Sequence, residues 1–193
     1  MTIPFLPVLL VLGAVVLFEG LVILGLVRTL RDVQVAIASG RLPQRLPVGV
    51  TSPRFRARDV RTGSEVDSAD LIGRELVVLF LSPGCPDCRR LADGTRQVPA
   101  EPGQTRIAVC HGGPREAGAF ADALASDVAV FADAEGTVFS AFGIASTPSA
   151  VVVDGTGRVG ASGGPRHSGE LASLVSTARN AAVGLDHPLP VVS

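Results

Sequence analysis

Residues 76–88, Leu-Val-Val-Leu-Phe-Leu-Ser-Pro-Gly-Cys-Pro-Asp-Cys, decide the fold of this chain. The first six, 76–81, are all apolar with no polar alternation, which is typical of a strand covered on both faces of a sheet. The turn residues 82–84 end the strand, and Pro86 suits the first turn of a helix, where its missing N–H has no partner to lose. The stretch therefore predicts a buried strand, a turn, and a helix that begins beside Cys85.

The two cysteines of this stretch have the spacing of a redox-active pair. At a helix N-terminus, unpaired backbone N–H groups and the helix dipole stabilise a thiolate, so we expect the pKa of Cys85 to lie below that of a free cysteine. Cys88 follows one helical turn later and can close a disulfide by attacking Cys85 in a mixed disulfide. Cys85 and Cys88 are therefore the predicted catalytic residues.

Two other interpretations of the C-x-x-C pair compete with this one. Half of a zinc site would need a second pair of ligands, and the nearby candidates, Cys110 and His111, are adjacent in sequence. A structural disulfide across four residues constrains few unfolded conformations and adds little stability. We therefore predict no metal site and no cofactor.

Composition indicates one domain with an appendage. The 17 basic residues, all arginine, nearly balance 18 acidic residues, which argues against a nucleic-acid partner. Three cysteines are too few for a disulfide scaffold. The cellular compartment must therefore be inferred from the cysteine pair and from the N-terminal segment.

The N-terminal segment has the composition of a membrane anchor. Ile3 to Val27 contains no Lys or Arg and a single charged residue, Glu19. At about 1.5 Å per residue it is long enough to cross a hydrocarbon core of about 30 Å. A cleaved signal peptide is the alternative, but a basic start and a clear cleavage site are missing. We predict a transmembrane helix and its extension at 1–39.

The rest of the chain is predicted to form a linker, a domain and a tail. Prolines and glycines indicate a stiff linker at 40–52, and a compact domain follows at 53–182 with a tail at 183–193. Arg54 to Arg58 alternates like a half-buried edge strand with a solvated arginine face. Strands and helices then alternate to the end of the domain, which predicts a mostly parallel sheet covered by helices on both faces. The strands are expected at 76–81, 106–110, 128–131, 150–153 and 158–161. The helix that begins at Pro86 is expected to continue through 89–96, and further helices are expected at 114–124, 134–142 and 170–181.

This order of features resembles the membrane-anchored thioredoxin-like proteins of TlpA and ResA type. The resemblance covers about 52–182 and rests on a Pro-x-Phe strand, Asp70-Leu71, the apolar strand with its C-x-x-C, and Phe142-Gly-Ile with Ser-Thr-Pro148. The phrase Leu-Ser-Pro-x-Cys-Pro-x-Cys is also similar to the MauD subgroup, accessory proteins of methylamine utilisation. The resemblance implies a thioredoxin-like α/β fold, a central mixed sheet flanked by helices, behind one transmembrane helix.

The resemblance also implies a substrate-binding loop. In such proteins a cis-proline, here Pro148, lies beside the first cysteine and leaves Thr147 free to pair with an extended substrate segment. Thr147, Pro148 and Pro86 are the expected substrate-binding residues. Leu79 and Leu91 stand where relatives carry a buried acid, a departure that affects proton handling.

Three functions compete. The first is a thiol-disulfide oxidoreductase that reduces or exchanges disulfides of exported proteins, with a membrane protein as a candidate electron donor. The second is a peroxiredoxin-like peroxidase that uses Cys85, because Ser82-Pro-Gly-Cys resembles a peroxidatic turn, although no arginine accompanies 146–148. The third is a Sco-type copper carrier, which would need His111 or His167. Cys110 is interpreted as a buried core residue, with a third redox thiol as the alternative.

Two arguments about the membrane orientation disagree. Arg28 and Arg31 follow the apolar segment directly, which by the positive-inside rule places the domain in the cytoplasm. The family resemblance favours the outer face. We expect a single-pass cell-membrane protein of bacterial type with its catalytic domain outside the cytoplasm.

Overall fold

The computed structural model describes Leu10 and residues 12–20 and 45–185, and it divides the chain into two compact units, Met1–Leu42 and Pro43–Ser193. In the first unit, residues 12–20 form a helix whose apolar side chains are exposed. Among the described residues, no helix has the length and apolarity needed to cross a membrane. The transmembrane helix expected at 1–39 lies for the most part outside the described residues and stays a prediction.

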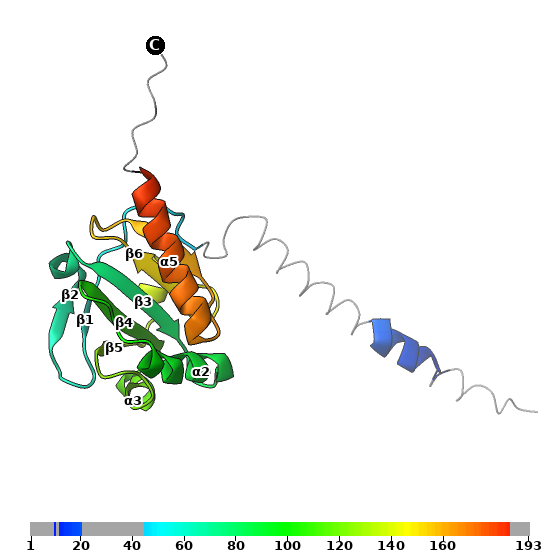
Figure 1. Cartoon of the computed structure of the whole chain (residues 1–193). Helices are drawn as coiled ribbons and strands as arrows, with labels where there is room; N and C mark the ends of the chain where they lie inside the picture. The colour runs from blue at the N-terminus through cyan, green and yellow to red at the C-terminus, as the bar shows by residue number, and fades with distance from the viewer. Residues whose placement is uncertain (1–9, 11, 21–44, 186–193) are drawn as a thin grey trace, which may run out of the picture. The chain divides into compact units, whose positions relative to one another are not determined.

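The second unit is built on a five-stranded mixed sheet (Figure 1). The strand order is β5-β4-β3-β6-β7, with β3 at the centre. β3 pairs in parallel with β4, and β4 with β5, whereas β6 and β7 are antiparallel. This is the expected thioredoxin-like arrangement with a mixed sheet. The sheet is not mostly parallel, contrary to what the alternation of strands and helices indicated, because β6 and β7 are antiparallel to their neighbours. The strands are β3 (Glu75–Leu81), β4 (Gln104–His111), β5 (Val128–Asp133), β6 (Ser149–Val153) and β7 (Val159–Gly163).

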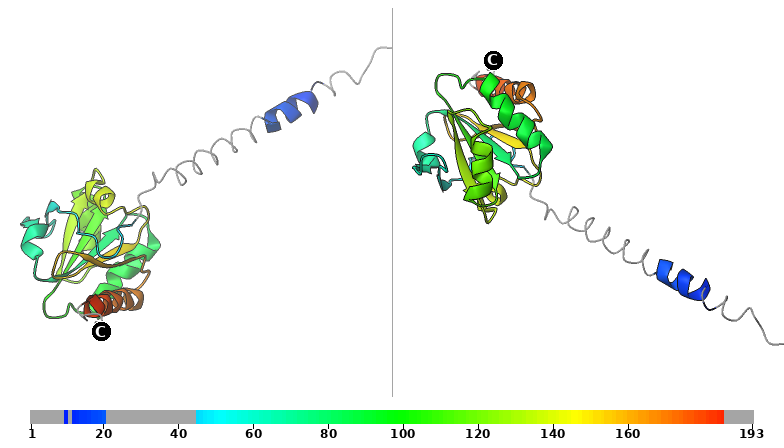
Figure 2. Two further views of the ribbon diagram at one scale, coloured as in Figure 1. Left: turned by 90° about the horizontal axis from the view of Figure 1, so that it is seen from above. Right: turned by 90° about the horizontal axis from the view of Figure 1, so that it is seen from below.

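Helices cover both faces of the sheet (Figure 2). One face packs against α2 (Pro86–Gly94), α3 (Pro114–Ala121) and α5 (Ser168–Leu185). The opposite face packs against α4 (Thr137–Ala141) and the segment around β1 (Arg56–Arg58). The sheet is thus the middle of three layers, which accounts for the apolar character of its strands on both faces.

Strand β3 contributes side chains to both hydrophobic cores, one on each face of the sheet. Leu79 and Leu81 belong to the core under α2, whereas Val78 and Phe80 belong to the core under α4. All four are fully buried. Because side chains alternate between the faces of a strand, a continuous apolar run is what a doubly covered central strand requires. The prediction of a buried strand at 76–81 is confirmed.

Phenylalanine rings fill the core under α4. The ring of Phe142 lies 5.3 Å from that of Phe80 and 6.0 Å from that of Phe55, and Phe80 also meets Phe139 edge-on at 5.1 Å. Edge-to-face pairs of this kind contribute about 0.5–1.5 kcal/mol beyond their buried area. Phe142 thereby anchors the segment that leads into Thr147.

The structure departs from the sequence-based expectations near the edges of the domain. Residues of the expected linker hydrogen-bond to β7: Gly49 N–H donates to the Val159 carbonyl at 2.7 Å, and Val159 N–H donates to the Val50 carbonyl at 2.9 Å. The short strand β2 (Glu65–Asp67), which pairs with β1, was not expected. Helix α5 continues to Leu185, into the expected tail, and residues 186–193 lie outside the described part.

Helix α4 is shorter than the stretch 134–142 predicted for it. The buried Asp133 carboxylate accepts hydrogen bonds from the backbone N–H groups of Thr137 and Phe139, both at 2.9 Å. A carboxylate that caps these N–H groups fixes the start of the helix. Gly136 precedes it with φ 69°, a left-handed conformation that suits glycine.

The alternation at Arg54 to Arg58 and the break between the last two strands are as expected, whereas α3 ends at Ala121 and not at residue 124. Arg54, Arg56 and Arg58 are exposed while Phe55 is buried, as the alternating pattern indicated. The chain reverses between β6 and β7, where the Asp154 carboxylate accepts hydrogen bonds from backbone N–H groups beyond it. An Asp that bonds its own following backbone is a common turn device.

Candidate active site

The cysteine pair lies at the junction of β3 and α2. Cys85 is the N-cap of α2 and Pro86 its first residue, as the sequence indicated. Cys85 and Cys88 form a disulfide, with their Cα atoms 5.2 Å apart. Gly84 precedes the pair with φ 76°, a conformation that a glycine adopts freely and an aromatic residue does not.

The two sulfur atoms differ in access. Cys85 is half-buried, whereas Cys88 is fully buried beneath α2. The backbone N–H of Cys88 donates to Cys85 Sγ at 3.1 Å. In the reduced pair this donor and the helix dipole would stabilise a Cys85 thiolate. Cys85 is therefore the sulfur that a substrate can reach. Cys88 is placed to attack Cys85 and release the substrate from a mixed disulfide.

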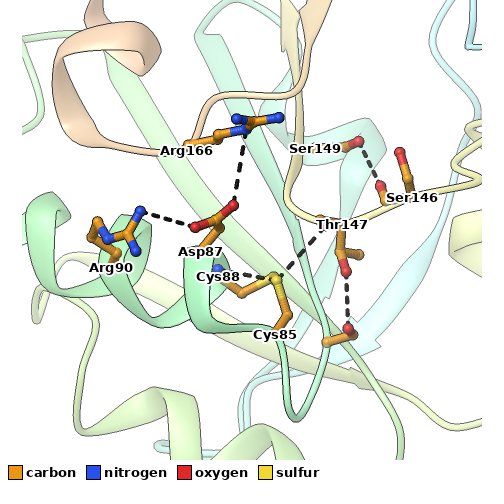
Figure 3. Close-up of a disulfide and its surroundings, with 9 residues drawn as sticks. Cys85, Asp87, Cys88, Arg90, Ser146, Thr147, Ser149 and Arg166 are labelled. Carbon is orange, nitrogen blue, oxygen red and sulfur yellow. Dashed lines mark hydrogen bonds and ion pairs between the residues drawn. A yellow bond between two sulfur atoms is a disulfide. The ribbon is translucent and has the colours of Figure 1, made fainter.

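The loop before β6 brings the predicted substrate-binding residues to the pair (Figure 3). The Thr147–Pro148 peptide bond is cis, as expected, and Pro148 is buried. The carbonyl oxygen of Thr147 lies 3.7 Å from Cys85 Sγ. The two cysteines and the loop residues Thr147 and Pro148 therefore lie together. Pro86, the fifth predicted site residue, is exposed at the start of α2.

Ser82 joins this loop to the turn before the cysteines. Its hydroxyl lies 2.9 Å from the hydroxyl of Thr147, within hydrogen-bonding distance. Sequence reasoning treated Ser82 as a turn residue only. The two residues are 65 positions apart, so no local pattern indicated their contact.

Asp87 lies between two arginines near the pair. Its carboxylate accepts a hydrogen bond from Arg90 at 2.9 Å and lies 3.9 Å from the guanidinium of Arg166, which comes from the segment between β7 and α5 (Figure 3). These cations offset the repulsion that Asp87 exerts on a Cys85 thiolate. Both arginines are largely exposed, so solvent weakens the effect. The contribution of Arg166 was not expected from the sequence.

The core beneath the pair is apolar. Leu79 and Leu91, where the family resemblance suggested a buried acid, are fully buried in the same core as Cys88. Cys110 lies in this core as a free thiol, and desolvation raises its pKa to about 12. At neutral pH the Cys110 thiol therefore stays protonated and is a poor nucleophile. This favours the interpretation of Cys110 as a core residue.

The two histidines considered as metal ligands make other contacts. The ring of His111 meets Phe139 edge-on at 5.5 Å, and His167 Nε2 lies 3.2 Å from the Glu170 carboxylate. Within the part of the chain that the structure describes, no three His, Cys, Asp or Glu side chains gather where they could hold a metal ion.

Comparison with known proteins places this fold and site in a family. Residues 48–162 match the model of the AhpC/TSA family. The methylamine utilization protein MauD of Paracoccus denitrificans is 28% identical over 134 residues, a match that covers 69% of this chain and 64% of MauD. The chain thus spans less than two thirds of the length of that relative.

Solved structures share the fold. DsbF of Mycobacterium tuberculosis, determined in mixed oxidised and reduced forms, is 26% identical with a TM-score of 0.58, and the match covers 68% of this chain and 99% of DsbF. The peroxidoxin BcpB of the same organism is 22% identical with a TM-score of 0.60, covering 70% and 98%. The family match spans more than half of the chain, so this protein belongs to the AhpC/TSA family and has the fold and cysteine pair of a thioredoxin-like oxidoreductase.

Proposed function

We propose that this protein is a thiol-disulfide oxidoreductase that reduces or exchanges disulfides of exported proteins. The observation that carries the proposal is the position of Cys85 Sγ, half-buried at the start of α2 and 3.7 Å from the Thr147 carbonyl oxygen. A sulfur in that position can react with a disulfide on an extended segment that pairs with the loop. The relationship to MauD and the likeness to DsbF support this chemistry.

The reaction proceeds by two thiol-disulfide exchanges. In the reduced protein, the Cys85 thiolate attacks one sulfur of a substrate disulfide, and the other substrate sulfur leaves as a thiolate that takes up a proton. Cys88 then loses its proton and attacks Cys85 Sγ, which releases the second substrate thiol and leaves the Cys85–Cys88 disulfide. A protein dithiol must reduce that disulfide before the next cycle. The same steps in reverse oxidise a substrate dithiol.

The loop before β6 holds the substrate during these steps. Among the backbone hydrogen bonds of the described residues, none uses the N–H or the carbonyl oxygen of Thr147. Both groups are therefore available to an extended segment that adds beside the loop, as in strand addition at a sheet edge. The hydroxyl contact with Ser82 holds Thr147 against the turn that carries Cys85.

Disulfide exchange fits the site better than peroxide reduction. A peroxidase uses an arginine to hold peroxide at the thiolate, and the two arginines drawn in Figure 3 contact Asp87 instead. Among the described residues, Cys85 Sγ accepts a hydrogen bond from Cys88 N–H and lies 3.7 Å from the Thr147 carbonyl oxygen.

A direct comparison of the two reactions tests this proposal. The reduced protein is mixed in turn with a synthetic peptide disulfide and with hydrogen peroxide, and loss of protein thiols is followed over time. We expect the peptide disulfide to react faster, and we expect Cys85→Ser to remove the reaction. Faster oxidation by peroxide at equal concentration would overturn the proposal in favour of a thiol peroxidase.

We also propose that the N-terminal segment tethers the protein to the cell membrane with the catalytic domain on the outer face. The apolar sequence from Ile3 to Val27 supports a single span. Arg28 and Arg31 favour the opposite orientation, whereas a role on exported proteins requires the outer face.

Thiol labelling of intact cells tests the orientation. A membrane-impermeant thiol reagent is applied with and without prior reduction, to cells that carry the wild type or Cys85→Ser. We expect labelling to increase after reduction in the wild type, because reduction opens the Cys85–Cys88 disulfide. Labelling that occurs only after lysis would place the domain in the cytoplasm and overturn this part of the proposal.

A further inference from the structure

A groove of about 380 Å³ opens beside the redox pair. Its wall toward Cys85 is formed by Ser82 and Thr147, the residues whose hydroxyls contact each other. Its other walls are formed by the end of β4 at His111, by α4, and by residues 144–146 of the loop before β6. The groove therefore continues directly from the place where a substrate segment would pair with Thr147.

The lining of this groove is apolar at its base and polar at its rim. Phe139 and Ile144 are buried side chains that line it, and the exposed His111 ring stands edge-on to Phe139 at 5.5 Å. Ser140 and Ser146 are exposed at its rim. None of the described lining residues is an Asp, Glu, Lys or Arg. Such a lining favours a large apolar or aromatic side chain and disfavours a charged one, which would lose hydration without gaining a partner.

The other hollow beside the pair has a different character. It lies on the Gly84 side and is lined by Arg89, Arg115 and Glu116 together with Phe120. Charged side chains of both signs face it, and they are exposed. The two sides of the cysteine pair therefore offer different chemistry to the two ends of a bound segment.

Strand geometry indicates which substrate residue can enter the groove beside Thr147. In an extended segment, residues two apart point to the same side and are separated by about 6.6 Å. When the substrate cysteine points at Cys85, the side chain two residues away also points at the protein. Residues 144–146 lead directly into Thr147 and line the groove, so a side chain next to the paired position can enter it.

We propose that this groove is a specificity site that binds a large, uncharged, preferably aromatic side chain two residues from the reactive cysteine of the substrate. The proposal rests on the proposed disulfide exchange at Cys85. Burial of one such side chain is worth enough to change affinity or rate by about tenfold or more, since a factor of ten requires about 1.4 kcal/mol. The substrates would then be protein segments with an aromatic residue near their cysteine.

A peptide series tests the proposal on a Cys88→Ala variant, in which Cys85 can react but cannot be resolved. Each peptide carries one cysteine as a mixed disulfide with thionitrobenzoate, and Trp, Gly or Glu two residues before or after it. The Cys85 thiolate attacks the peptide sulfur and releases thionitrobenzoate, which is followed by its absorbance. We expect one of the two Trp peptides to react about tenfold faster than its Gly counterpart, and the Glu peptide to gain nothing.

Filling the groove should remove this preference for Trp over Gly. Ser140 is exposed on α4 and lines the groove. Ser140→Phe is expected to bring the rate of the Trp peptide down to that of the Gly peptide measured with the same variant. Ser176→Phe, at an exposed position of α5, is the matched control and should keep the preference.

Each outcome bears on one proposal only. Equal rates for Trp and Gly peptides, or a Trp preference that survives Ser140→Phe, would overturn the specificity site and leave disulfide exchange standing. Failure of every peptide to react with Cys85 would instead overturn the proposed function. The chain contains no Trp or Tyr, so the fluorescence of the peptide Trp reports binding separately, with peptides in which serine replaces the cysteine.

Discussion

Replacement of Cys88 by alanine is expected to leave the protein joined to its substrate as a stable mixed disulfide, whereas replacement of Cys85 is expected to yield none. Cys85 is the half-buried sulfur beside Thr147, and Cys88 is fully buried beneath α2. A substrate can therefore reach Cys85 but not Cys88. Without the second thiol the intermediate has no internal route to release, and it accumulates.

Non-reducing electrophoresis and mass spectrometry of the captured species measure this effect. The matched control is Cys110→Ala, because Cys110 is a buried thiol whose raised pKa keeps it protonated at neutral pH. This control is expected to resolve its substrate as the wild type does. A mixed disulfide that forms through Cys88 or Cys110 in the Cys85→Ser variant would contradict the assignment of the nucleophile.

The centre of the fold could be predicted because its signals are local. The apolar run 76–81 specified a strand covered on both faces, and the proline after Cys85 specified a helix start at that residue. Each of these depends on neighbours within one turn or a few strand residues. The position of Thr147 beside Cys85, in contrast, came from the family resemblance, since no local pattern relates two segments so far apart.

The parts that sequence reasoning missed depend on long-range contacts. Arg166, which precedes α5 in the sequence, contacts Asp87 at the start of α2, and Ser82 contacts Thr147 across 65 positions. The start of α4 is set by Asp133, which belongs to the preceding strand. The groove beside Thr147 is assembled from four separate segments and has no sequence signature at all. Such features follow from the packed fold and not from periodicity.

The largest effect on stability is expected from Phe142→Ala. Phe142 is fully buried, its ring lies within 6.0 Å of the rings of Phe55 and Phe80, and it carries the chain into the loop that ends at Thr147. Removal of a buried phenylalanine ring leaves a cavity and costs about 3–5 kcal/mol of unfolding free energy. Because small domains are stable by only about 5–15 kcal/mol, this is a large share of the total.

Urea unfolding, followed by far-ultraviolet circular dichroism, measures the change. Phe142→Leu is the matched variant, because it keeps most of the apolar volume and should cost about 1–2 kcal/mol at most. Disulfide exchange by the folded fraction of Phe142→Ala should also slow, since the variant loosens the support of the loop that places Thr147 beside Cys85. A loss below about 1 kcal/mol for Phe142→Ala would show that the core under α4 can collapse around the missing ring, and that the loop does not depend on it.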